Sequence, residues 1–271
     1  MNSPLAYIGG KSKLSKQIIS LVPDHKVYCE VFSGAAWVFF RKPPSQVEVI
    51  NDLDSELIAF YRVVQNHLEE FLRQFRWLLT SREWFRDWQN QLGAGGLTDI
   101  QKAARYYYVQ RLAFGGKVKG RTYGVELDGR SPRINILRLE EEMSAIHLRL
   151  AHVRVENLTW QELINRYDRA ETFFYCDPPY YQCPDYKHNF VLKDFLEIAD
   201  VLKGIQGRFM LSINDHPEIR EIFKCFHRKS VSLLYTVGNQ PTKAQELIYS
   251  NYDLKENITP SLFDNFNKPM Y

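Results

Sequence analysis

The pattern of hydrophobic and polar positions predicts an open α/β sheet. Short apolar runs, typical of buried strands, alternate with segments that repeat apolar residues every three or four positions. The predicted strands cover residues 26–32, 47–51, 172–176, 208–213, 230–237 and 245–251. Helical spacing covers residues 12–22, 55–79, 192–205 and 216–224. Such alternation is typical of a mostly parallel sheet with helices on both faces, and the two successive late strands predict an antiparallel end.

A different pattern interrupts this alternation between about residues 80 and 151. The segment is rich in Trp, Tyr and Arg, is mostly helical, and is broken by LGAGGL and by the polar GKVKGRTYGVELDGRSP. We therefore expect a Rossmann-like catalytic domain made of residues 1–58 and 152–255, with a helical insertion at 59–151. Residues 256–271 show no periodicity and are expected to form a flexible tail.

The net charge of +3 is unevenly distributed. Residues 102–138 contain nine Lys or Arg and two acids, which gives +7 locally and leaves −4 for the rest of the chain. A basic zone inside a near-neutral chain indicates contact with a polyanion such as nucleic acid. A solvated basic face is the alternative explanation of the same charge, so the charge distribution alone does not establish nucleic-acid binding.

Composition narrows the class of protein further. A hydrophobic content of 45% with 25% charged residues is typical of a globular protein. No run approaches the ~18 apolar residues of a membrane span, and the N-terminus lacks the apolar core of a signal peptide. The four cysteines have no CxxC spacing, and the seven histidines show no HxH or HExxH pattern. We expect a cytoplasmic protein with reduced thiols, no membrane association and no catalytic metal.

Candidate chemistry lies where predicted strands end, which is where doubly wound sheets bind ligands. VFSGAA follows the first strand, and its Gly34 allows a ligand to approach the backbone. Asp52 ends the second strand eighteen positions later, where an acid accepts hydrogen bonds from ribose hydroxyls in nucleotide-type sites. Asp52 is equally suited to capping the following helix. Without GxGxxG or a Walker lysine, this combination favours S-adenosylmethionine as the ligand.

The third such position is FFYCDPPY, residues 173–180. A strand that ends in a tight turn explains the two prolines by itself. The order of several motifs is a more specific signal than any one of them. The chain carries YIGGK at 7–11, then VFSGAA, the basic insertion and DPPY at 177–180, followed by LSIND and AQELIYSN. In this order and over most of its length, the chain resembles the Dam-like, alpha-group DNA adenine-N6 methyltransferases.

The resemblance implies a site-specific enzyme that transfers a methyl group from S-adenosylmethionine to N6 of an adenine flipped out of double-stranded DNA. It implies cofactor-binding roles for Tyr7, Lys11, Phe32, Gly34, Asp52 and Asp177. It implies catalytic roles for Asp177, Pro178 and Tyr180. It implies that the insertion contacts DNA through Arg111, Phe114, Lys117, Lys119, Arg121, Arg130 and Arg133.

The chemistry of the reaction suggests how the DPPY residues would act. The Asp177 carboxylate and the Pro178 carbonyl are the expected acceptors for the two N–H bonds of the adenine amino group. Tyr180 would offer an aromatic face to the flipped base, with Tyr181 and Phe190 as candidates for a second face. His188 and Asn189, close by, either read the adenine edge or are ordinary loop residues.

Alternatives stay open at this stage. One is a methyltransferase-like DNA-binding module that has lost catalysis, and another is methylation of cytosine N4 or of a protein amide. We expect a monomer in a bacterial or phage-infected cell. It would act either with a separate cognate restriction endonuclease or as a solitary, prophage-type modification enzyme.

Overall fold

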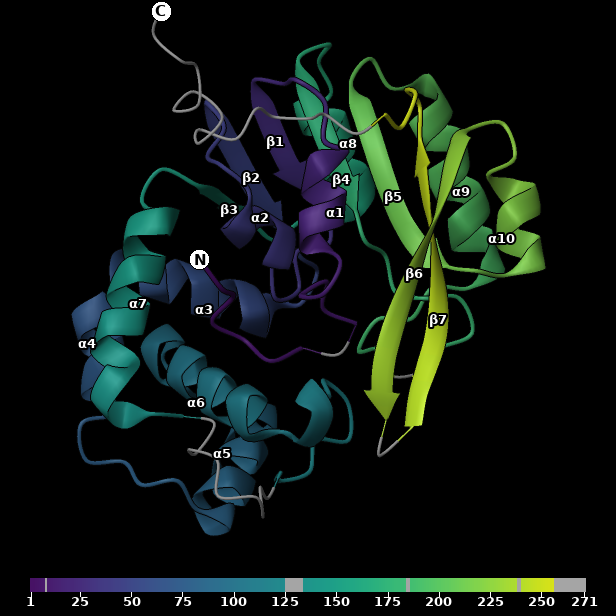
Figure 1. Ribbon diagram of the computed structural model, residues 1–271. Helices are drawn as coiled ribbons and strands as arrows, with labels where there is room; N and C mark the ends of the chain where they lie inside the picture. Colours follow the sequence, from purple (N-terminus) through teal and green to yellow (C-terminus); the bar gives the residue numbers. More distant parts are fainter. Residues whose placement is uncertain (8, 125–133, 184–185, 238–239, 256–271) are drawn as a thin grey trace, which may run out of the picture.

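The computed structural model describes residues 1–7, 9–124, 134–183, 186–237 and 240–255. These residues form a seven-stranded sheet in the order β3-β2-β1-β4-β5-β7-β6 (Figure 1). Strands β1 to β5 run parallel, whereas β7 runs antiparallel to both of its neighbours. The expected Rossmann-like sheet with a late antiparallel strand is therefore confirmed. The strands are β1 Val27–Glu30, β2 Val47–Asn51, β3 Arg154–Glu156, β4 Thr172–Cys176, β5 Arg208–Asn214, β6 His227–Val237 and β7 Gln240–Ser250.

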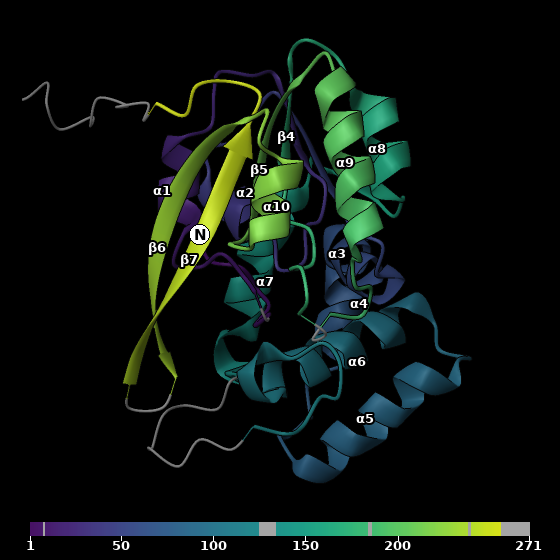
Figure 2. The same cartoon turned by 90° about the vertical axis from the view of Figure 1, so that its right-hand side faces the viewer.

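Helices cover both faces of the sheet. Helices α1 (Ser15–Ser20) and α2 (Trp37–Arg41) lie on one face, and α8 (Trp160–Tyr167), α9 (Leu192–Gly204) and α10 (Pro217–Ile222) lie on the other (Figure 2). Side chains of β4 alternate between these two layers, as strand geometry requires. Phe173 and Tyr175 join one buried cluster, while Phe174 and Cys176 join the other. Strand β4 is thus buried on both sides, which explains its continuous run of apolar residues.

The remaining helices lie beyond the carboxyl ends of the parallel strands (Figure 1). They are α3 (Ser55–Asn66), α4 (Leu68–Arg73), α5 (Arg82–Ala94), α6 (Asp99–Leu112), α7 (Ile136–Leu150) and the short 3₁₀ turn η1 (Phe114–Gly116). The expected boundary between residues 58 and 59 falls inside α3. Three consecutive tyrosines at 106–108 of α6 are buried, and they account for much of the aromatic content of this segment.

Polar contacts join these helices to the sheet-bearing part of the chain, and one of them holds the N-terminal segment. Gln110 is fully buried, and its amide donates to the carbonyls of Ala6 at 2.8 Å and Gly116 at 2.9 Å. Gly116 has a φ of 68°, and a Cβ there would stand 2.8 Å from the Tyr7 nitrogen. The N-terminal segment therefore packs directly on the turn after α6, where only glycine fits.

The structure differs from the predicted elements in several places. The segment 55–79, predicted to be helical, forms the two helices α3 and α4 on either side of His67, whose φ of −139° is not helical, and the second of them already ends at Arg73. Strand β7 begins at Gln240, five residues before the predicted start at 245, so the polar residues 240–244 are paired with β6 and do not form a loop. Strand β3 and α8 were not predicted, although Thr159 and Glu162 form a capping box that signals the start of α8. Arg130, Arg133 and the expected tail at 256–271 lie outside the described residues.

No helix in the described part of the chain is long and apolar enough to cross a membrane.

Candidate active site

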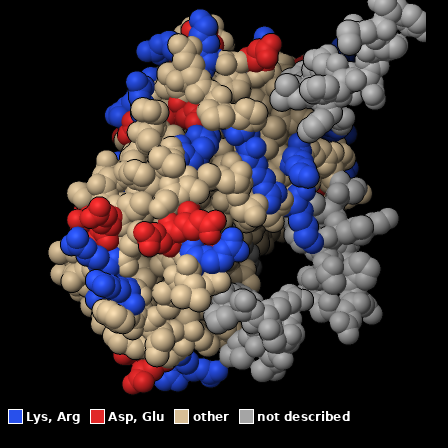
Figure 3. All heavy atoms as spheres, turned by 60° about the vertical axis from the view of Figure 1, so that its left-hand side comes forward, with Lys and Arg blue, Asp and Glu red and all other residues tan. Residues whose placement is uncertain are grey.

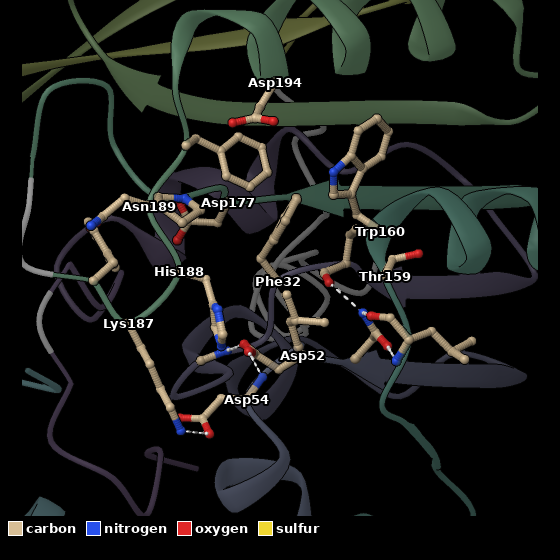
Figure 4. A pocket seen from close by; sticks show the side chains of 18 of the residues that line it. Phe32, Asp52, Asp54, Thr159, Trp160, Asp177, Lys187, His188, Asn189 and Asp194 are labelled. Carbon is tan, nitrogen blue, oxygen red and sulfur yellow. Dashed lines mark hydrogen bonds and ion pairs between the residues drawn. The ribbon is translucent and has the colours of Figure 1, made fainter.

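The carboxyl ends of β1, β2 and β4 meet at a cavity of about 260 Å³. Figure 4 shows Phe32 at its centre, with Trp160 on one side, Asp177 and Asn189 on another, and Asp52 and Asp54 below. Of the residues expected to bind a cofactor, the cavity is lined by Tyr7, Phe32, Gly34, Asp52 and Asp177. The fold thus brings together positions that are separated by up to 170 residues in the sequence.

Asp52 is oriented by backbone groups. Its Oδ2 accepts a hydrogen bond from the Gly34 nitrogen at 2.9 Å, and its Oδ1 accepts one from the Asp54 nitrogen at 2.9 Å. Helix α3 is capped by Asp54, whose side chain accepts from the Glu56 nitrogen at 3.1 Å. The alternative that Asp52 caps this helix is therefore wrong. Burial raises the pKa of Asp52 to about 6, against the lowering effect of the two backbone hydrogen bonds.

The backbone conformation of the turn after β1 explains why this turn contains small residues. Gly34 has a φ of 45°, and a Cβ there would stand 3.3 Å from the Tyr7 ring. Ala36 also adopts the left-handed region, with a φ of 52°, immediately before α2 begins. The Gly34 carbonyl accepts a hydrogen bond from the Tyr61 hydroxyl at 2.8 Å. The turn is held tightly, and Gly34 leaves room between Tyr7 and Asp52.

The opposite wall comes from the connection between β3 and α8, which sequence reasoning missed. The Asn51 side chain donates to the Leu158 carbonyl at 3.1 Å and accepts from the Leu158 nitrogen at 2.9 Å. This pair of bonds holds Leu158, Thr159 and Trp160 along the cavity. Phe32 packs edge-on against Phe190, with ring centroids 5.6 Å apart, so much of the cavity wall is apolar.

The loop that follows DPPY crosses the same cavity. Lys187 forms ion pairs with Asp54 at 2.8 Å and Glu56 at 3.3 Å, which connects this loop to the start of α3. His188 and Asn189 are exposed, yet both line the cavity. Tyr181 does not, because its ring packs on Phe195 and His216 and its hydroxyl donates to Glu218. Of the two candidates for a second stacking face, Phe190 lies in the cavity wall and Tyr181 does not.

Asp177 follows β4 and is held through one oxygen. Its Oδ1 accepts hydrogen bonds from the Lys11 ammonium at 2.6 Å and the Ser212 hydroxyl at 2.9 Å. Ser212 lies on β5 and shares a second hydrogen bond, of 2.9 Å, with the Tyr175 hydroxyl. Burial raises the pKa of Asp177, although the adjacent Lys11 opposes this effect. Both of these hydrogen bonds use Oδ1, so among the described residues Oδ2 has no donor and can accept from a ligand.

Lys11 does not line the cavity itself but contacts Asp177, which does. Its side chain is 3% exposed, and its ammonium also donates to the Tyr180 hydroxyl at 2.8 Å and the Gly9 carbonyl at 3.3 Å. Burial alone would lower the pKa of Lys11, but the carboxylates of Asp177 and Glu246 outweigh it and raise the pKa well above its usual value. Ser212 and Glu246 were both missed as site residues, although LSIND and AQELIYSN belong to the recognised motif order.

Four of the expected DNA-contacting residues, Phe114, Lys117, Lys119 and Arg121, lie in a loop closed by the bridge between Ala113 and Tyr123. Lys117 and Lys119 are exposed, and the ring of Phe114 is 58% exposed. Two arginines are more enclosed: Arg111 is half-buried in α6, and Arg121 donates to Gln110 at 3.1 Å and stacks on Tyr106. Figure 3 shows Lys and Arg in several groups with Asp and Glu among them, so that face carries no single continuous basic surface.

Comparisons with known proteins agree with this geometry. A family model of D12 class N6 adenine-specific DNA methyltransferases matches residues 7–237. The Type II methyltransferase M1.LlaDCHI of Lactococcus lactis subsp. cremoris is 27% identical, over 91% of this chain and 94% of the relative. The DNA N-6-adenine-methyltransferase of Escherichia phage P1 is 22% identical over 83% of this chain, which spans 32% of the phage protein. The Type II methyltransferase M.CviBI of Paramecium bursaria Chlorella virus NC1A is 23% identical, over 82% of this chain and 86% of the relative.

Proposed function

Because the chain belongs to the D12 class of N6 adenine-specific DNA methyltransferases, we propose that its cavity holds S-adenosylmethionine and that an adenine flipped out of double-stranded DNA enters beside Asp177. A base inside a duplex cannot be reached by the residues that line a cavity, so flipping is required. Membership of the family favours adenine over the cytosine N4 alternative. The DPPY residues are all present, which favours an enzyme over an inactive module.

The residues of the cavity fit the proposed cofactor. Asp52 is fixed by two backbone N–H groups and keeps acceptor positions for ribose hydroxyls. Phe32, Phe190 and Trp160 provide apolar walls for a purine ring, and Gly34 permits close approach to the backbone. S-Adenosylmethionine, when bound, supplies a methyl group already activated as a sulfonium. The protein therefore has to supply position and electrostatics.

Asp177 is the residue that we propose acts on the nucleophile, and its one-sided hydrogen bonding is the observation that carries the proposal. The lone pair of the adenine amino nitrogen is delocalised into the ring, which makes the nitrogen a poor nucleophile. Asp177 Oδ2 and the Pro178 carbonyl would accept its two N–H bonds and draw the nitrogen toward a tetrahedral shape. Lys11 and Ser212 hold the carboxylate in one orientation, so it is in place when positive charge develops.

Tyr180 would hold the flipped base by stacking. Its hydroxyl is fixed between Lys11 and Glu246, which restricts the ring to one orientation. Stacking of a base on such a ring contributes about 1–3 kcal/mol in other proteins. Lys11, expected to bind the cofactor, would act on it through Asp177, which lines the cavity while Lys11 lies behind it.

DNA would be held by the loop after α6. The exposed Lys117 and Lys119 are suited to phosphate contacts, which give affinity and salt dependence but little sequence information. Phe114 is an exposed ring beside them, and Arg111 and Arg121 would act from beneath. We propose the same role for Arg130 and Arg133, which the described residues do not include.

We also propose that the protein acts as a cytoplasmic monomer. The Type II names of two relatives support a setting in which a separate restriction endonuclease cuts the unmethylated site. A solitary modification enzyme would use the same active site.

Methyl transfer to DNA by the purified protein tests the proposal. Double-stranded DNA is incubated with S-adenosylmethionine, and its nucleosides are then analysed for N6-methyladenine. Asp177→Ala should abolish the product while the circular dichroism spectrum and most DNA binding stay unchanged. Asp200→Ala, which removes a carboxylate that is 75% exposed on α9, is the matched control and should keep full activity. Retained turnover in Asp177→Ala, or a methylated cytosine as the product, would overturn the proposal.

A further inference from the structure

A second buried carboxylate lies next to the DPPY residues. Glu246 is on β7, opposite Asn214 of β5, and only 2% of its surface is exposed. Its Oε1 accepts a hydrogen bond from the Tyr180 hydroxyl at 2.5 Å, and its Oε2 lies 3.7 Å from the Lys11 ammonium. Leu247 and Tyr249 point to the other face of the sheet, so the alternation of β7 directs Glu246 toward the N-terminal segment.

This arrangement is costly if its only role is to stabilise the fold. Oε2 of Glu246 is buried and has no hydrogen-bond donor among the described residues. A buried carboxylate oxygen without a hydrogen-bond donor loses several kcal/mol of hydration, for which an ammonium 3.7 Å away does not supply a hydrogen bond, and native proteins keep few such oxygens. The three charged groups Lys11, Asp177 and Glu246 also leave a net charge of −1 in a buried cluster. An apolar residue on β7 would avoid both costs.

We infer that Glu246 is a positioning residue for methyl transfer: it fixes the Tyr180 hydroxyl and the Lys11 ammonium, and through them the orientation of Asp177. The inference rests on the proposed function, because it assumes that Asp177 faces the adenine amino group. The Tyr180 hydroxyl donates its one proton to Glu246, so its oxygen is left to accept from Lys11. Lys11 then directs another N–H bond at Asp177 Oδ1, which leaves Oδ2 for the substrate.

The charge of Glu246 also acts on Asp177 at a distance. After burial, the largest influences on the pKa of Asp177 are Lys11, which lowers it, and Glu246, which raises it, and the hydrogen bond from Ser212 also lowers it. Other titratable groups near Asp177 lie on several elements, namely Glu30, Tyr175, Cys176, Tyr180 and Tyr186. Asp177 has to be ionised to accept the amino N–H, so kcat rises with pH as Asp177 loses its proton. Removal of the negative charge at position 246 lowers the pKa of Asp177 and moves that rise to lower pH.

Two variants test the inference. Glu246→Gln keeps the shape and an acceptor for Tyr180 but removes the charge. We expect kcat to fall about tenfold or more, because the charge-assisted hydrogen bond from Tyr180 becomes a weaker neutral one, with KM for DNA changed less than about threefold. The acid limb of its pH profile should move to lower pH. Tyr180→Phe keeps the ring that stacks on the base but removes the link between Lys11 and Glu246, so it should also lower kcat with little change in KM.

The controls separate this inference from the proposed function. Glu221→Gln removes a carboxylate that is 71% exposed on α10, and its kcat and pH profile should match the wild type. Unchanged kcat and pH profile in Glu246→Gln would overturn the role of the charge, and a fully active Tyr180→Phe would overturn the role of the link. If the wild type is active and Asp177→Ala is not, the proposed function stands in either case. If Glu246→Gln does not fold, the Tyr180→Phe result decides.

Discussion

The buried carboxyl of Glu30 provides a quantitative test of how burial changes a pKa in this fold and, with it, the free energy of unfolding. The residue ends β1 and is 2% exposed. Its Oε2 accepts hydrogen bonds from the Tyr28 hydroxyl at 2.6 Å and from the Phe39 nitrogen at 2.9 Å, in the first turn of α2. Burial, with a smaller contribution from the Asp177 carboxylate, raises the pKa of Glu30 from its usual 4.5 to about 8, against the lowering effect of the two donors. At pH 7 the folded protein therefore favours the protonated acid.

The sign and size of the effect on stability follow from linkage. Between pH 4.5 and 8 the unfolded chain has lost the proton of Glu30 and the folded chain keeps it. The stabilising contribution is thus complete below about pH 4.5 and is lost as the pH rises toward about 8. Each pH unit in this interval lowers the free energy of unfolding by about 1.4 kcal/mol, which amounts to about 5 kcal/mol across the whole interval.

Glu30→Gln isolates this contribution. The amide oxygen of Gln replaces Oε2 as the acceptor for both donors, and the side chain does not titrate. Urea denaturation at pH 5.5, 6.5 and 7.5 should show the variant gaining about 1.4 kcal/mol on the wild type with each unit of pH. The surface control Glu221→Gln should follow the wild type at all three values. Parallel curves for the wild type and Glu30→Gln would refute the reasoning.

Three further predictions concern ligand binding. Asp52→Asn should weaken S-adenosylmethionine binding in calorimetry, and the wild-type affinity should fall below about pH 6, where protonation of Asp52 removes an acceptor. Gly116→Ala should destabilise the fold by about 1–3 kcal/mol in thermal unfolding and weaken cofactor binding, because its Cβ would displace the Tyr7 backbone. Lys119→Ala should weaken DNA binding with a salt dependence shallower by about one phosphate contact, whereas Lys224→Ala, at an exposed position just after α10, should not.

Much of the fold could be predicted because its strands are buried on both faces. Strand β2 matches the predicted 47–51, and β4 matches 172–176, since each is a short apolar run bounded by residues that break a strand. Strand β3 could not be found in the same way. It is a three-residue edge strand that begins with the exposed Arg154, so it carries no apolar run.

The candidate site was predictable only where a local pattern marks it. Asp52 and Asp177 each follow a buried strand, and this position alone identifies them as candidates. Ser212 and Glu246 reach Asp177 and Tyr180 from 35 and 66 positions away, through the pairing of β4 with β5 and of β5 with β7. Strand register over such a distance is decided by tertiary packing, and no short pattern encodes it. The sequence likewise identified Lys11 without showing that its partner is a carboxylate.

The two carboxylates of the site are held in different ways, and the difference matches the ligands that we propose for them. Within the described part of the chain, the hydrogen bonds that Asp52 accepts come from backbone N–H groups, an arrangement suited to accepting from neutral hydroxyls. Asp177 is bound by a cation and lies near a second carboxylate. A full positive neighbour alone would weaken the attraction of Asp177 for the charge that develops on a methylated amine. Glu246 offsets the charge of Lys11, so the cluster keeps both a rigid carboxylate and a net negative charge where the reaction becomes positive.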